Sequence, residues 1–371
     1  MHDRMLRGGY QSDWSLLLDR VLLHSRPGAP VDVVLSDVLH GVESGIVFCG
    51  AKAREESQRR RGAVEAVVVD PERYVHHRAT IAEPFCLPKG GGTGQLSLLG
   101  EADDQLDGLL QGQRGGGSGI ALTPTGYVGA DDCGALRAVM ERASELNGAE
   151  DIVVLPIDKG WLRERHLDFL TTQLSALPVT KALVLCDTRN PLERRGAATA
   201  LRELVRVPRT GLLRTDLAGL DALAHGAVFS AIGVQTSMRH GRPPSDGGPP
   251  PTGRRATVLH PQLMRYFRCS TLHEVYGAQG TPYCSCTYCD GRALGRFEDT
   301  VEGVGQADLH NIAVWAPWAA QLQAEPDKNV RRSMWRSLCE QAVASHEEIN
   351  RQLRRSVFKP DPALREWAGI R

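Results

Sequence analysis

Short apolar runs rich in β-branched residues recur along the chain and alternate with longer stretches of helical periodicity. Runs of this kind are typical of strands that are buried on both faces of a sheet. They occupy residues 31–35, 64–69, 120–123, 152–157, 182–185 and 228–234. Candidate helices occupy residues 134–147, 162–176, 191–205 and 217–225. Buried strands that alternate with helices predict a parallel sheet covered by helices, either an α/β barrel or a doubly wound sheet.

Proline and glycine content divides the chain into three predicted parts. Residues 1–239 carry the strand and helix pattern, which a glycine-rich insertion interrupts at about 87–119. Residues 240–255 predict a flexible loop, because a segment so rich in proline and glycine buries too little apolar surface to order itself. Residues 256–371 hold a cysteine cluster and a long helical pattern at 315–355, which Pro326 should divide into two helices.

Charge and hydropathy narrow the possible functions. The 371 residues contain 44 lysines plus arginines and 44 aspartates plus glutamates, so the chain is not a polycation that binds nucleic acid through bulk charge. No apolar run reaches the roughly 18 residues that a membrane span needs, and residues 1–9 are polar. We therefore expect a cytoplasmic protein with no membrane association. The nine cysteines are mostly isolated, which favours reduced thiols over a disulfide framework.

Three cysteines form the one cluster with the spacing of a metal site. Cys284, Cys286 and Cys289 stand at positions i, i+2 and i+5, a spacing that suits a tight knuckle with its thiolates turned inward. Zinc takes four tetrahedral ligands, usually sulfur or nitrogen, so a fourth ligand must come from elsewhere. His310 is the preferred candidate and His273 the competing one. Four protein ligands close the coordination shell, so the sequence predicts a structural zinc ion rather than a catalytic one.

The knuckle, followed by His310-Asn311-Ile312-Ala313, resembles the zinc subdomain of the tRNA-guanine transglycosylases, the queuine and archaeosine tRNA-ribosyltransferase superfamily. The resemblance covers about thirty residues. It implies a TIM-type (β/α)8 barrel that carries a zinc subdomain and C-terminal helices. It also implies exchange of guanine for a 7-deazaguanine base, tRNA or DNA as the partner, and a homodimer or a heterodimer.

The chain departs from the family where the chemistry should lie. Residues 212–218 and 223–229 are similar to the helix and strand that lead to the family's nucleophilic aspartate, and that aspartate would fall near Ser230 or Ala231. Neither residue is an acid. The family's Asp-Ser-Gly-Gly-Phe-Gln signature is also absent. The resemblance implies a covalent ribosyl–aspartate intermediate, and this chain has no aspartate at the corresponding position. The resemblance therefore supports the fold and the zinc better than the activity.

Acidic residues at the predicted strand ends could still support chemistry, because residues just past the strand ends line the active site of such a barrel. Asp158 and Asp187 are the candidate catalytic residues. Asp70 and Arg239 are candidates for substrate binding, the latter to a phosphate. Asp37 lies past another predicted strand. The alternative is that strand-end aspartates cap the following helix or shape the turn.

Basic residues in the last helices offer a second contact for nucleic acid, since their side chains could neutralise a phosphate backbone. Acidic neighbours such as Glu340 and Glu348 favour instead an ordinary solvated helix face. The basic residues are Arg331, Arg332, Arg336, Arg351, Arg354, Arg355 and Lys359.

Two functional hypotheses follow, with a barrel enzyme of other specificity as a weaker third. The first is a divergent transglycosylase-like enzyme in which another acid replaces the missing nucleophile. The second is a non-catalytic zinc scaffold that binds nucleic acid or a partner subunit. Two carboxylates about 5–7 Å apart in an open barrel mouth would favour the enzyme. A filled mouth would favour the scaffold.

Overall fold

The computed structural model describes residues 14–28, 45–60, 62, 64–87, 101–115, 119–244 and 253–370. Within them, eight parallel strands form one sheet in the order β3-β2-β1-β8-β7-β6-β5-β4, and the edge strands β3 and β4 approach each other. The strands are β1 (Arg20–Ser25), β2 (Ile46–Cys49), β3 (Val67–Asp70), β4 (Ala121–Leu122), β5 (Asp151–Asp158), β6 (Thr180–Cys186), β7 (Thr210–Thr215) and β8 (Phe229–Gly233). The predicted α/β barrel is confirmed, nearly closed.

Five of the six predicted runs match strands β3, β4, β5, β6 and β8. The sixth, residues 31–35, lies outside the described residues, as do Asp37, residues 245–252 of the proline-rich loop and much of the glycine-rich insertion. Strands β1, β2 and β7 were not predicted from the apolar pattern. Strand β1 contains Arg20 and His24, and β7 contains Arg214, so polar residues interrupt the apolar runs.

Helices cover the outer face of the sheet. They are α2 (Ala53–Arg60), α3 (Glu101–Gln113), α4 (Cys133–Ala143), α5 (Glu164–Ala176), α6 (Ala197–Arg206) and α7 (Ala218–His225). The four predicted helices correspond to α4, α5, α6 and α7. Alternate strand residues point the other way and fill the barrel interior with buried side chains, among them Leu22, Val47, Val68, Val154, Val184, Leu213, Phe229 and Ala231. The interior is thus a packed core, as in other α/β barrels.

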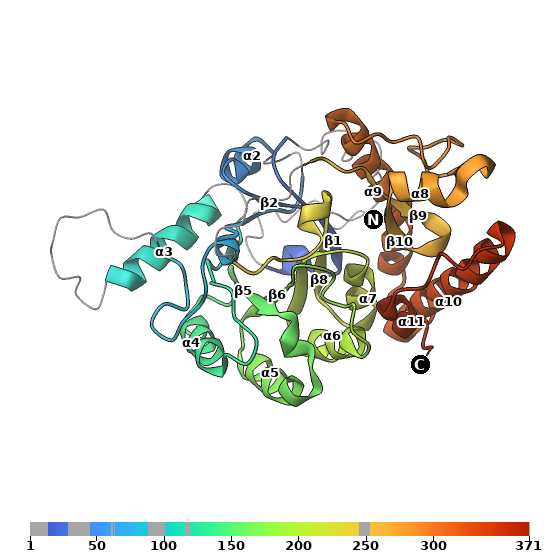
Figure 1. The fold of residues 1–371 in the computed structure, drawn as a ribbon. Helices are drawn as coiled ribbons and strands as arrows, with labels where there is room; N and C mark the ends of the chain where they lie inside the picture. The colour runs from blue at the N-terminus through green and yellow to red at the C-terminus, as the bar shows by residue number, and fades with distance from the viewer. Residues whose placement is uncertain are drawn as a thin grey trace.

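The rest of the chain is appended to one side of the barrel (Figure 1). It comprises the antiparallel pair β9 (Thr257–His260) and β10 (Arg265–Arg268), then α8 (Cys269–Tyr276), α9 (Val301–Ala324), α10 (Lys328–Leu353) and α11 (Pro362–Trp367). Pro326 lies between α9 and α10, so the predicted break is confirmed. Helix α9 begins nine residues before His310, earlier than the sequence pattern indicated, because Thr300 caps it by accepting a hydrogen bond from the Gly303 N–H at 3.0 Å.

Buried polar contacts join the appended helices to the barrel. The Asp221 carboxylate of α7 is fully buried and accepts hydrogen bonds from Trp335 Nε1 of α10 at 2.9 Å and from Arg202 Nη2 of α6 at 2.7 Å. Arg331 at the start of α10 pairs with Asp19, the residue just before β1. Helices α6, α7, α10 and α11 therefore pack as one layer beside the barrel.

Candidate metal centre and barrel mouth

The three knuckle cysteines and His310 converge on one point. The ligand atoms of Cys284, Cys286, Cys289 and His310 all lie within 4.8 Å of one another. The distances from His310 Nδ1 to the three sulfurs are 3.8, 3.5 and 3.1 Å. A tetrahedral zinc ion with bonds of about 2.3 Å to sulfur and about 2.0 Å to nitrogen separates such atoms by about 3.5 Å. The group therefore has the composition and the spacing to bind a metal such as zinc.

Local backbone hydrogen bonds shape the knuckle. The Cys284 N–H donates to the Arg292 carbonyl at 3.0 Å, and the Gly291 N–H returns to the Cys284 carbonyl at 2.9 Å. Asp290 and Gly291 both have positive φ angles, 47° and 77°, which turn the chain back on itself. This tight turn brings sulfurs that are close in sequence to one side of the loop. It explains why the cysteine spacing alone was informative.

Helix α9 and strand β9 position the fourth ligand. His310 Nε2 lies 2.9 Å from the Leu259 carbonyl oxygen, so Nε2 carries the proton and Nδ1 is free to bind a metal. The adjacent Asn311 accepts from the Leu259 N–H at 2.6 Å and donates to the Thr257 carbonyl at 2.8 Å. The His-Asn pair therefore fastens α9 to β9 while it completes the site.

The sulfurs also have the electrostatic support that thiolates need. Arg296 Nη1 lies 3.2 Å from Cys289 Sγ, and the Cys289 N–H donates to Cys286 Sγ at 3.3 Å. Hydrogen bonds from the Cys284 and Cys289 thiols lower the pKa of Cys286 far below its ordinary value. The same hydrogen bonds raise the pKa of Cys289, so without a metal the cluster favours the thiolate, the form that binds metal, at Cys286. The competing His273 instead donates to the Gly295 carbonyl at 2.5 Å and is not part of the cluster.

The strand-end aspartates have local partners. Asp158 ends β5, where it accepts from the Gly160 N–H at 2.7 Å and from the Tyr127 hydroxyl at 2.5 Å. Asp187 follows β6, and its carboxylate pairs with Lys159 Nζ at 2.7 Å and accepts from the Thr188 N–H. These contacts are those of turn-shaping residues. The catalytic roles of Asp158 and Asp187 stay predictions.

Asp70 ends β3 in a fully buried polar cluster. It accepts from the Tyr74 hydroxyl at 2.7 Å and from the Glu72 N–H at 2.8 Å, and it lies 3.4 Å from His24 Nε2 of β1. Burial alone would raise the pKa of Asp70, but the interactions with His24, Tyr74 and Glu72 lower it. Asp70 is therefore an ionised carboxylate enclosed by protein groups. Its predicted role in substrate binding stays untested.

Arg214 connects this cluster to the far side of the mouth. It lies near the end of β7 with a positive φ of 51°, and it donates to the Glu72 carboxylate and to the Tyr74 hydroxyl. Its other nitrogens donate to the backbone carbonyls of Ser237 and His240, at 3.2 and 3.1 Å. The Arg214 side chain is 3 % exposed, so this part of the mouth is occupied by protein groups that bond to one another.

A segment after β8, residues 234–241, which we call the strap, crosses the mouth from β8 to β6. Met238 of the strap is fully buried, with its sulfur 3.3 Å from Cys49 Sγ at the end of β2. A Cβ added at Gly233 would lie 2.2 Å from the Met238 backbone, and one added at Gly241 would lie 2.5 Å from Cys186 Sγ. Glycine is needed at Gly233, just before the strap, and at Gly241, its last residue, because at both places the backbone and side chains of the strap and the strands are in direct contact.

Ser230, one of the two positions where the resemblance would place a nucleophile, faces away from the barrel interior. Ser230 lies between Phe229 and Ala231, both of which point into the barrel. A Cβ added at Gly219 of α7 would lie 3.2 Å from Ser230 Cβ, so the serine faces that outer helix. Ala231 does face inward but has no functional group. Neither residue offers a nucleophile at the mouth.

Arg239, the predicted phosphate contact, is 7 % exposed and joins the strap to the appended part. Its guanidinium lies 3.7 Å from the centre of the Tyr266 ring on β10 and 3.9 Å from the Asp308 carboxylate on α9. Burial raises the pKa of Asp308 to about 7. The structure therefore places Arg239 in an internal stacking contact rather than on an open surface.

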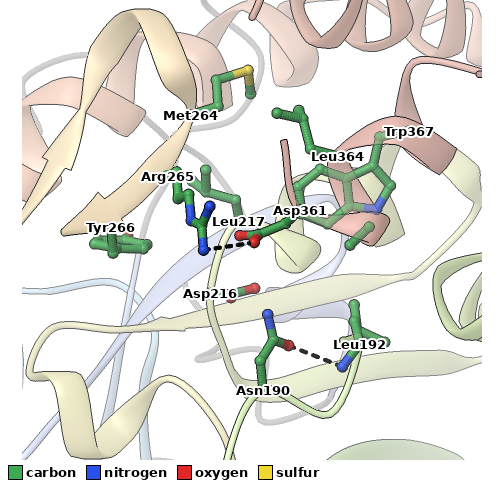
Figure 2. A pocket seen from close by; sticks show the side chains of 11 residues that line it. Asn190, Leu192, Asp216, Leu217, Met264, Arg265, Tyr266, Asp361, Leu364 and Trp367 are labelled. Carbon is green, nitrogen blue, oxygen red and sulfur yellow. Dashed lines mark hydrogen bonds and ion pairs between the residues drawn. The ribbon is translucent and has the colours of Figure 1, made fainter. Parts of the chain in front are cut away.

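A small cavity of about 30 Å³ remains between the ends of β6 and β7 and the appended part (Figure 2). In Figure 2, Arg265 and Asp361 form an ion pair of 3.1 Å beside it, and Asp216 and Asn190 lie below. That volume admits one or two water molecules. It is too small for a nucleobase.

Most of the basic residues of the last helices have local partners. Arg331 pairs with Asp19, Arg336 with Glu340 at 2.9 Å, and Arg351 with Glu348. Arg355 donates to the Val275 carbonyl. Arg336 and Arg351 thus have the acidic neighbours of a solvated helix face, whereas Arg331 is buried and joins α10 to the barrel. A contact of these helices with nucleic acid stays a prediction.

Sequence reasoning missed the residues that fill the mouth. They are His24, Glu72, Tyr74, Arg214 and Met238. The one signal in the sequence was a histidine or an arginine placed directly after apolar residues, as in Val-Leu-Leu-His and Leu-Leu-Arg. A charged group in a buried strand requires a partner, but the sequence does not say which.

Comparison with known proteins adds no further assignment, since no family model and no curated protein matches the chain. Within the described ranges, none of the helices combines the length and the hydrophobicity that a membrane-spanning helix requires. The fold and the cysteine–histidine group define an α/β barrel protein with a candidate metal centre.

Proposed function

We propose that the chain is a non-catalytic, transglycosylase-like zinc scaffold that binds nucleic acid or a partner subunit. The observation that carries this proposal is the filled barrel mouth. Arg214, Glu72, Tyr74 and Asp70 bond to one another at the strand ends, and Arg214 also donates to two backbone carbonyls of the strap. Base exchange needs an open pocket for a flat ring and a carboxylate aimed at the sugar.

Zinc has a structural role in this proposal. Three thiolates and one imidazole complete a tetrahedral shell, so no coordination position is left for a substrate or a reactive water. When bound, the ion would hold the knuckle against α9, and through His310 against β9. The residues of this chain then keep a rigid surface in place rather than carry out a reaction.

A base-exchange assay tests the proposal. Radiolabelled guanine is incubated with tRNA and the full-length protein, beside an active transglycosylase as positive control, and denaturing gels are examined for a covalent adduct. We expect neither incorporation nor adduct. Exchange above background that Asp158→Asn or Asp187→Asn abolishes would overturn the proposal and return those residues to a catalytic role.

The binding half of the proposal needs its own measurement. Gel-shift assays with tRNA and with duplex DNA, and pull-down with an active transglycosylase subunit, should give at least one specific complex. Molar mass in solution, measured by light scattering, separates a homodimer from a heterodimer. If all of these assays are negative for the zinc-loaded protein, the scaffold function is wrong.

A further inference from the structure

A groove lined by arginines runs along the outer side of the barrel, between α6 and the helices α10 and α11. Two adjoining hollows of about 580 and 350 Å³ form it, and both are lined by Arg202 and Gly369. Volumes of this size are typical of ligand sites. The groove contains the arginines Arg195, Arg202, Arg332, Arg336 and Arg365. This concentration of positive charge is local, since the whole chain has a net charge of zero.

Glu366 is the acidic residue in the groove lining, and its carboxylate is already engaged. One oxygen accepts from the Thr199 N–H at 2.8 Å and from the Thr199 hydroxyl at 2.9 Å. The other accepts from the Gly196 N–H. The carboxylate therefore satisfies the free N–H groups at the start of α6, where the helix dipole favours a negative charge. It does not pair with the groove arginines.

Acids outside the lining neutralise two of the arginines. Arg202 pairs with the buried Asp221, and Arg336 pairs with Glu340. The other three have no acidic partner among the described residues. Arg332 donates only to the Lys328 carbonyl and the Asn329 side-chain oxygen, while Arg195 and Arg365 are exposed. Three uncompensated guanidinium groups thus line a groove that can hold an anionic ligand.

We propose that this groove binds the phosphate backbone of a nucleic-acid strand, an inference that rests on the proposed scaffold function. Guanidinium groups match phosphate oxygens in charge and in bidentate geometry. Trp367 is 5 % exposed, so the aromatic residue of the lining offers no open face on which a base could stack. The groove therefore contacts phosphates and is indifferent to sequence.

The walls favour nucleic acid over an acidic peptide. Helices α6, α10 and α11 form them, so the groove has no strand edge to which an extended peptide could add. Apolar lining is limited to Pro362, Ile370 and the buried Trp367. A peptide would find few apolar anchors there, whereas a phosphate backbone needs none.

Fluorescence anisotropy with a fluorescein-labelled oligouridylate of about 20 nucleotides tests the assignment on the full-length protein between about 50 and 200 mM salt. Arg195→Glu/Arg365→Glu reverses two of the uncompensated charges. Arg255→Glu/Arg351→Glu is the matched control, because it changes the net charge equally at arginines outside the groove. We expect the groove variant to bind at least about tenfold more weakly. The magnitude of its salt slope should fall by about 0.7 for each phosphate that the variant no longer neutralises.

The control variant should bind with a dissociation constant within about twofold of that of the unaltered protein. Arg195→Gln/Arg365→Gln, which removes the charges but keeps a long polar side chain, should weaken binding to an intermediate degree. Equal weakening by both charge-reversed variants would attribute binding to bulk charge and overturn the assignment. Displacement of the oligonucleotide by polyglutamate as effectively as by unlabelled oligouridylate would assign the groove to acidic peptides and also overturn it.

The two proposals fail in different ways. An unaltered protein that binds no oligouridylate overturns the groove assignment but leaves the absence of base exchange, and binding of a partner subunit, intact. Base exchange by the unaltered protein overturns the non-catalytic function whatever the groove binds.

Discussion

Replacing Asn311 by alanine should weaken the attachment of α9 to β9 without removing the metal. The Asn311 side chain is 1 % exposed and makes two hydrogen bonds, to the Leu259 N–H at 2.6 Å and to the Thr257 carbonyl at 2.8 Å. Alanine would leave both backbone groups without a partner in a buried position. Each of the two orphaned groups costs about 1–3 kcal/mol, so we expect the free energy of unfolding to fall by about 2–6 kcal/mol.

Urea unfolding of the zinc-loaded protein measures this loss, with the free energy obtained by linear extrapolation. Metal content is determined on the same samples by mass spectrometry. Gln306→Ala is the control on the same helix, because the Gln306 side chain bonds only to the neighbouring Glu302 in an exposed hydrogen bond. The control should change stability by less than about 0.5 kcal/mol, and all three proteins should keep one zinc per chain.

Two results would refute this reasoning. A loss below about 1 kcal/mol would show that the two bonds to β9 are replaced by solvent, and so that this part of α9 is not buried as described. Loss of zinc from Asn311→Ala would show that Asn311 acts through the metal, by positioning His310, rather than through the strand.

Three further outcomes are expected. Cys289→Ser should reduce zinc from one ion per chain to a small fraction while His273→Ala retains it, and metal analysis that finds equal content would contradict the ligand assignment. Burial lowers the pKa of Lys181 to about 8, so the charged form is disfavoured in the folded state. The free energy of unfolding, compared with that of Lys181→Met, should therefore rise between pH 8 and about 10.5. A difference between the two proteins that does not change with pH would contradict this. Asp221→Asn should lower the free energy of unfolding by about 3 kcal/mol, because it leaves Arg202 without its counterion. Urea unfolding measures the loss, and adding Arg202→Met to the Asp221→Asn variant should restore part of it.

The fold was predictable where the chain has uninterrupted apolar runs. Strands β5 and β6 are buried along nearly their full length, and their runs of β-branched residues and leucines predict this burial. Strand β1 was missed because its apolar residues are flanked by Arg20 and His24, whose partners come from other parts of the barrel. A short apolar run bounded by charged residues does not resemble a buried parallel strand.

The metal centre was predictable for a different reason. Three of its four ligands lie within six residues, so one turn fixes their geometry, and His310 supplies the only long-range contact. The barrel mouth has the opposite character. Arg214 and Glu72 are 142 residues apart in sequence. The Asp221–Trp335 contact, which joins α10 to α7 outside the mouth, likewise spans 114 residues. Pairs of this kind form only in the completed fold, and no short sequence motif predicts them.

The metal centre and the barrel mouth are connected through one side chain. Arg239 belongs to the strap, and it stacks on Tyr266 of β10 and faces Asp308, two residues before the ligand His310. The same strap supplies the Ser237 and His240 carbonyls that Arg214 needs in order to remain buried. Helix α9, Arg239 and the strap therefore form a continuous set of contacts between the knuckle and the mouth. A zinc ion bound by these four residues would have no coordination position left for a substrate, so its contribution would be to hold α9, which contacts the strap through Asp308 and Arg239.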